Sequence, residues 1–206
     1  MTPEATKGFR DFLRLRDFAG DEDPEGLFEA LASLIVWADR EGKNPHADND
    51  TLLSRSSDWI QVYMGLLLHL ATIDKHFFRL AQRMAARTLT RHDPPARTYR
   101  HMAAYLLTAD PPNTGKPKLA RDVIAIIALA VLSEAGVHPT EAPGRGETGR
   151  SGCARLGSML FQSGAGREYK SLEGMWGERE AKLLAAGFSQ DSVSEFFAAS
   201  FRMKRT

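Results

Sequence analysis

The sequence predicts an all-α protein, a single-domain bundle of about seven or eight helices around a central buried helix at residues 118–135. Apolar residues recur at helical spacing in one segment after another, and no segment shows the alternation typical of a half-buried strand. Residues 118–135 are apolar nearly all round, as in a helix at the centre of a bundle. A chain of 206 residues, 43% of them hydrophobic, can bury one sizeable core. The whole chain, 1–206, is therefore predicted to form one domain.

The first predicted helix begins at Asp23 and Pro24. Aspartate is a good N-cap, and proline is favoured at the first helical position. The apolar residues that follow keep helical spacing, and Gly42 is a suitable stop. Before this helix, residues 1–22 mix charged and apolar side chains and are either an arm or a short helix. After it, residues 44–50 form a turn-rich connector.

The stretch from Ser57 to His92 is predicted to be helical. Ser57 is a good N-cap, and the prolines after Asp93 end the segment because proline disfavours a helix at itself and at the residue before it. The segment is either one helix or two helices that bend near residues 72–74. A further helix is predicted at 96–109. Its inner apolar stripe consists of Tyr99, Met102, Leu106 and Leu107.

The helix at 118–135 is predicted to end at Gly136. The stretch 138–152 holds two prolines, four glycines and two arginines and is predicted to be a flexible loop. Two helices are predicted after it, at about 153–161 and 172–186.

The last predicted helix follows a glycine stop and a serine cap. Gly187 closes the helix at 172–186, and Ser189 is the N-cap of the final helix. An apolar stripe at helical spacing supports the final helix. The stripe consists of Val193, Phe196, Phe197 and Phe201.

The charges are distributed unevenly along the chain, although the formal net charge is only +1. Residues 1–56 carry seven Lys/Arg against twelve Asp/Glu, a net charge of −5, and residues 57–206 carry twenty against fourteen, a net charge of +6. Either an acidic N-terminal region folds over a basic body, or a basic face is left for a nucleic acid.

The composition predicts a cytoplasmic protein of bacterial type. Cys153 is the single cysteine, so no intrachain disulfide can form. The first residues are too charged for the apolar region of a signal peptide. The longest apolar run, 123–132, is far shorter than the roughly 20 residues that a membrane span needs. Rich alanine and arginine usage is typical of bacterial proteins. We expect no membrane association.

A row of basic residues occupies the second half of the stretch from Ser57 to His92. Five residues recur every four positions and form this basic row: Lys75, Arg79, Arg83, Arg87 and Arg91. No acidic residue lies between Asp74 and Asp93. Side chains four apart are neighbours on a helix, so the row repels itself unless other charges offset it. Arginine contacts phosphate bidentately and lysine as a point charge, so the row can follow a nucleic-acid backbone. The predicted polyanion-binding residues are Lys75, Arg79, Arg83, Arg87, Arg91, Arg97 and Arg100.

Other interpretations of the row stay open. It is a solvated helix face, or it pairs with acids such as those at Glu22–Glu29. That acidic cluster also suits the positive end of its own helix dipole, where its role is capping. An acidic protein surface is a further partner for the row, as in a regulatory or inhibitor-like module.

No metal site or cofactor is predicted. His69, Asp74 and His76 are ligand types, but metal ligands on one helix usually pair at i,i+3 or i,i+4, as in H-E-x-x-H. The glycine-rich stretch 144–152 has amides that could wrap a phosphate, yet it matches no nucleotide-binding motif and is more simply a connector. Cys153 has no CxxC partner and no nearby histidine, which argues against a nucleophile.

Arg87 and His92 are separated by four residues. This spacing resembles the R-x4–6-H motif of HEPN ribonucleases, all-α dimers in which arginine and histidine act on the RNA phosphodiester. The resemblance implies that Arg87 stabilises developing negative charge and that His92 handles a proton. It covers these two residues of the 206.

The function that the sequence favours is a non-catalytic helical subunit or adaptor. Its predicted partner is a nucleic-acid backbone or a ribonucleoprotein, contacted through the basic row. The alternative is a module that binds an acidic protein surface, and the third is a HEPN-like ribonuclease.

Overall fold

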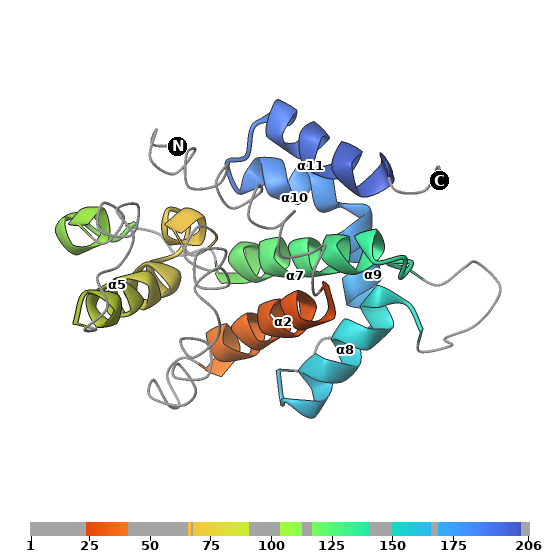
Figure 1. Ribbon diagram of the computed structural model, residues 1–206, viewed down its shortest axis with the longest axis horizontal. Helices are drawn as coiled ribbons and strands as arrows, with labels where there is room; N and C mark the ends of the chain where they lie inside the picture. Colours follow the sequence, from red (N-terminus) through yellow and green to blue (C-terminus); the bar gives the residue numbers. More distant parts are fainter. Residues whose placement is uncertain are drawn as a thin grey trace. The chain divides into compact units, whose positions relative to one another are not determined.

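The computed structural model describes residues 24–40, 66, 68–90, 104–112, 117–140, 150–165 and 169–202 (Figure 1). Every regular element in these ranges is a helix, and none is a strand, which confirms the all-α prediction. The chain divides into two compact units. The first unit comprises residues 1–15 and 55–117, and the second comprises residues 16–54 and 118–206. The helix count and the single domain stay predictions.

The second unit contains six of the labelled helices. Among them, α2 packs against α8, α8 against α9, and α10 against α11. No described helix is long and apolar enough to cross a membrane. The six helices are α2 (Pro24–Arg40), α7 (Pro117–Glu134), α8 (Gly152–Gln162), α9 (Tyr169–Gly177), α10 (Arg179–Ala185) and α11 (Gln190–Arg202).

Helix α7 is the most thoroughly buried of the described helices. Every residue from 122 to 132 is buried, as the apolar run in the sequence predicts. Asp122 is the one charged residue in this run, and its Oδ2 lies 2.9 Å from the Nζ of Lys182 on α10. The hydrogen bond to Asp122 raises the pKa of Lys182. The pair gives the buried carboxylate the opposite charge that burial requires.

Three described helices end in the same way, with a glycine in the left-handed region. Gly136, Gly164 and Gly187 have φ angles of 85°, 73° and 90°. After each glycine, the next N–H reaches back five residues, as in the bond from Val137 N to Leu132 O at 2.9 Å. This pattern is the Schellman motif, which satisfies carbonyls left open at a helix end. The predicted stops at Gly136 and Gly187 are confirmed.

The start of α8 is held against the end of α7. Ser151 caps the helix by accepting a hydrogen bond from Ala154 N at 3.2 Å. The N–H groups of Gly152 and Cys153 donate to the carbonyls of residues 138 and 139, both at 2.9 Å. A Cβ on Gly152 would lie 3.0 Å from Leu129 Cδ2, so glycine permits this close approach.

The flexible loop predicted at 138–152 therefore has ordered ends. The carbonyl groups of residues 138 and 139 accept hydrogen bonds from the first residues of α8, and Gly152 already belongs to that helix. Sequence pattern cannot show this, because the partners come from opposite ends of the stretch. Residues 141–149 lie outside the described part of the chain.

The prediction of a single helix at 172–186 is wrong, because two helices, α9 and α10, occupy this range. The helix is interrupted at Glu178, whose N–H is shared between the carbonyls of Gly174 and Met175, both at 3.2 Å. Gly177 precedes the break, and glycine weakens a helix interior.

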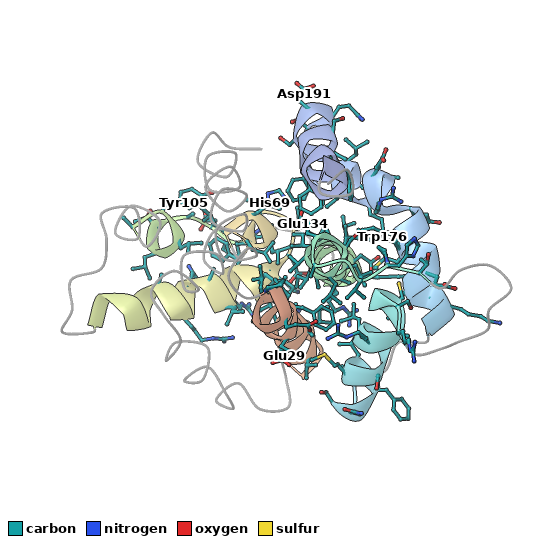
Figure 2. The ribbon with its side chains drawn as sticks, turned by 45° about the vertical axis from the view of Figure 1, so that its right-hand side comes forward. Glu29, His69, Tyr105, Glu134, Trp176 and Asp191 are labelled. Atoms are coloured by element: carbon teal, nitrogen blue, oxygen red, sulfur yellow. The ribbon has the colours of Figure 1, made fainter. Side chains whose placement is uncertain are left out.

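An arginine between two aromatic rings follows this break. The Arg179 guanidinium lies 5.0 Å from the ring centroids of both Trp176 and Phe197 and donates to Trp176 O at 3.1 Å. Figure 2 shows Trp176 on α9. These cation–π contacts join α9, α10 and α11.

The final helix begins as predicted. Ser189 Oγ accepts a hydrogen bond from Ser192 N at 3.2 Å, which confirms Ser189 as the N-cap of α11. Val193, Phe196 and Phe197 are buried, and the side chain of Phe201 lies outside the described part.

A bidentate ion pair joins α2 to α8. Both terminal nitrogens of Arg155 donate to the carboxylate of Glu25, one of them at 2.8 Å. The same guanidinium lies 5.5 Å from the centroid of the buried Phe28 ring. The hydrogen bond with Arg155 lowers the pKa of Glu25.

Helix α2 begins at Pro24, as the sequence predicts.

In the first unit, a tight turn separates two helical segments. Residues 66 and 68–71 are helical, Thr72 to Asp74 form the turn, and α5 (Lys75–Thr90) follows. Thr72 N and Oγ1 both bond to His69 O, at 3.0 and 2.7 Å. The second of the two alternatives for this stretch, a pair of helices with a bend at 72–74, is therefore correct.

The helix predicted at 96–109 is described only as a helical turn at 104–108. Leu106 is buried as predicted, but Leu107 is 48% exposed, so its place in the inner stripe was wrong. Helical spacing cannot separate two adjacent leucines, because only the packing partner decides which one faces inward. Several other predicted features lie outside the described residues. They are the segment 1–22, Gly42, the connector 44–50, Ser57, Asp93, Tyr99 and Met102.

Candidate functional site

Helix α5 presents a buried apolar side and an exposed basic side. Its described apolar residues are almost fully buried, apart from the exposed Ala86. Lys75 and Arg79 are exposed, whereas Arg83 is half-buried. We call Lys75, Arg79 and Arg83 the basic face of α5. The buried residues are Phe77, Phe78, Leu80, Ala81 and Ala85.

A buried aspartate caps this helix. Asp74 Oδ1 accepts hydrogen bonds from the N–H groups of His76 at 2.8 Å and Phe77 at 3.2 Å. Cations near a helix N-terminus are disfavoured by the helix dipole, and a capping carboxylate offsets that effect for Lys75. The acidic residue nearest the row in the sequence is therefore engaged with the helix backbone.

The cations do not form a straight line. A helix turns by about 100° per residue, so a repeat of four drifts by roughly 40° at each step. Lys75 and Arg79 remain on the solvent side, and by Arg83 the drift has reached a half-buried position. A five-member row with this repeat winds around its helix by about 160° from end to end.

The side chains of the other predicted site residues are not described. Arg87 belongs to α5, but its side chain lies outside the described part of the chain. The residues that lie wholly outside it are Arg91, His92, Arg97 and Arg100. Helix α5 therefore carries four of the seven predicted contact residues, and the side chains of three of them are described. The Arg87–His92 pair of the HEPN resemblance stays a prediction.

The two exposed cations have no ionic partner among the described residues. None of the ion pairs formed there includes Lys75 or Arg79. Two acids of the predicted Glu22–Glu29 cluster act elsewhere. Glu25 is hydrogen-bonded to Arg155, and the charge of Glu29 adds to the effects that raise the pKa of Arg155.

Sequence reasoning missed a contact beside the basic face. Gln82 Nε2 donates to Leu106 O at 2.7 Å and ties the turn at 104–108 to α5. Gln82 follows Arg79 by three residues, so the two are neighbours on the helix surface. The two bonded residues are 24 positions apart, and no local pattern signals such a contact.

The last residue of the glycine-rich stretch, Gly152, and the two residues after it do not offer their amides to a phosphate. The N–H groups of Gly152, Cys153 and Ala154 all donate to acceptors within the protein. An anion site at a helix start needs such amides free.

The other candidates from the sequence are Cys153 and the three potential metal ligands His69, Asp74 and His76. Burial raises the pKa of the Cys153 thiol to about 12, so the reactive thiolate is scarce at neutral pH. His69 and Asp74 are buried, and His76 is exposed. Among the described residues, no group of three or more potential ligands could hold a metal ion.

The chain was compared with known proteins. No protein-family model matches it, and neither a curated protein nor a solved structure matches it. The assignment of function therefore rests on the residues themselves.

Proposed function

We propose that this protein is a non-catalytic helical subunit or adaptor that contacts a nucleic-acid backbone, alone or within a ribonucleoprotein, through the basic face of α5. The observation that carries the proposal is the exposure of Lys75 and Arg79 on a helix whose opposite side is buried. The acidic residue next to them, Asp74, is occupied as the helix cap.

The chemistry of such a face suits phosphates. The guanidinium of Arg79 can donate two parallel hydrogen bonds to one phosphate, and the ammonium of Lys75 acts as a point charge. Four residues rise by about 6 Å along a helix, so the two cations can engage separate phosphates. Contacts of this kind release counterions and do not read base edges, so binding is salt-dependent and insensitive to sequence.

The helices of the second unit have a different role in this proposal. We infer that α7 is the central helix of the bundle, since residues 122–132 are buried and its Asp122 holds Lys182 of α10. In this proposal the second unit contributes a stable core, and the first unit, which contains α5, contacts the nucleic acid.

A binding titration with a charge-reversal variant tests the proposal. Wild type is titrated with fluorescent RNA, single-stranded DNA and duplex DNA at low salt, beside Arg79→Glu. Loss of one contact and gain of one repulsion is expected to weaken binding by at least tenfold on every nucleic acid. The reduction is uniform because the contact is to the backbone.

The matched control is Lys170→Glu, the same change of charge at an exposed position of α9 in the second unit. It should bind as wild type does, and circular dichroism should show both variants folded. If wild type binds no nucleic acid at low salt, or if both variants weaken binding equally, the proposal is wrong. Wild type that binds an acidic protein but no nucleic acid would favour the acidic-partner alternative.

A further inference from the structure

We infer, on the basis of the proposed function, that the nucleic acid bound beside α5 is single-stranded. Its phosphates lie on Lys75 and Arg79, and its unpaired bases lie against Tyr105 and Leu107 on the turn at 104–108.

The turn at 104–108 is attached to α5 by a hydrogen bond. Gln82 Nε2 holds Leu106 O at 2.7 Å, so Tyr105 and Leu107, its sequence neighbours, are fixed beside α5. Gln82 is the i+3 neighbour of Arg79 on the helix surface. Figure 2 shows the turn that carries Tyr105 alongside α5. The turn and the basic face belong to the same compact unit.

The turn presents one aliphatic and one aromatic side chain. Leu107 is 48% exposed and Tyr105 is half-buried, so an apolar side chain and part of an aromatic one are open to solvent. The turn itself is internally bonded, with Thr108 Oγ1 donating to Ala104 O at 2.8 Å. The two side chains are therefore presented on an ordered element of the protein.

A duplex and a single strand expose different groups to a protein. In a duplex, the faces of the bases are stacked and hidden, and only phosphates and base edges meet a protein. A single strand exposes base faces that stack on aromatic side chains while a basic surface tracks the backbone. A duplex can use the basic face alone, whereas a single strand can use the basic face and the turn together.

The test compares three polyanions that separate charge from stacking. They are oligouridine of about ten nucleotides, a duplex of equal length and inorganic polyphosphate, which has charge but no bases. Wild type is expected to bind oligouridine about tenfold more tightly than the duplex, from one stacked base. Tyr105→Ala should remove most of this preference, and Leu107→Ser should reduce it severalfold. Neither change should alter the affinity for polyphosphate.

Tyr105 is half-buried, so Tyr105→Leu is a second variant that keeps apolar bulk and removes the aromatic face. A preference for the duplex, or a preference for oligouridine that all three variants retain, would overturn the inference. Failure of the proposed function has a different signature, because Arg79→Glu would then leave the affinity for all three polyanions unchanged.

Discussion

Gly187 and Gly174 are both exposed glycines, but their backbones differ. Gly187 has a φ of 90° at the end of α10, whereas Gly174 lies within α9 without a positive φ. A Cβ on either residue would meet nothing within 4 Å. Space is therefore equal at the two positions, and only backbone conformation separates them.

Alanine at these two positions is predicted to act in opposite directions. Gly187→Ala should lower the free energy of unfolding by about 1 kcal/mol, because a residue with a Cβ is strained in the left-handed region. Gly174→Ala should raise it by up to about 1 kcal/mol, because alanine favours a helix interior. Urea denaturation followed by circular dichroism measures both. Equal effects of the same sign would contradict the Schellman ending of α10.

Asp74 illustrates how a residue can matter to the candidate site without touching a partner. Its carboxylate caps α5, so it fixes where the helix and its basic face begin. The sequence left open whether the segment bends at residues 72–74, and it placed Asp74 among the rejected metal candidates. Its cap could have been recognised from an aspartate followed by a run without acids.

At the scale of elements, local chemistry predicted four of the described helix boundaries. Proline at 24, glycine at 136 and 187, and serine at 189 act on the backbone next to them, so the sequence alone signals these boundaries. The break at Glu178 and the exposed Leu107 depend on contacts between elements. For α5, the sequence predicts one feature and misses another. The exposed and buried sides of the helix follow helical periodicity, but the hydrogen bond from Gln82 to Leu106 joins residues 24 positions apart.

The contact between α2 and α8 predicts a dependence of stability on pH. Arg155 lowers the pKa of Glu25, so the folded state binds the proton less readily than the unfolded state. The contribution of the pair is present above the unfolded pKa of about 4.3 and is lost as pH falls through the lower folded pKa. Glu25→Gln should lower the free energy of unfolding by about 1 kcal/mol or less at pH 7, because the pair is partly exposed.

The measurement is chemical denaturation of wild type and Glu25→Gln between pH 7 and pH 3. The difference between the two proteins should shrink towards zero below about pH 4. Glu180→Gln, which changes an exposed acid on α10, is the control and should differ little from wild type throughout. A difference that stays constant down to pH 3 would contradict the pairing of Glu25 with Arg155.

At the scale of the whole molecule, the sequence raised the question of whether the acidic N-terminal region neutralises the basic row. Among its described acids, Glu25 and Glu29 act on Arg155 of α8, within the second unit. The described exposed cations of the basic row have no ionic partner among the described residues. Neutralisation of the row by the other acids of residues 1–56 stays a prediction, because their side chains lie outside the described part of the chain.

The dependence of RNA affinity on salt tests this account most directly. For a single strand, the slope of log affinity against log salt concentration falls by roughly 0.7 for each phosphate contact that is lost. We predict that Arg79→Gln binds RNA with a slope shallower by about that amount than wild type, and that Lys170→Gln leaves the slope unchanged. Equal slopes for wild type and Arg79→Gln would show that the basic face of α5 does not contact the phosphate backbone.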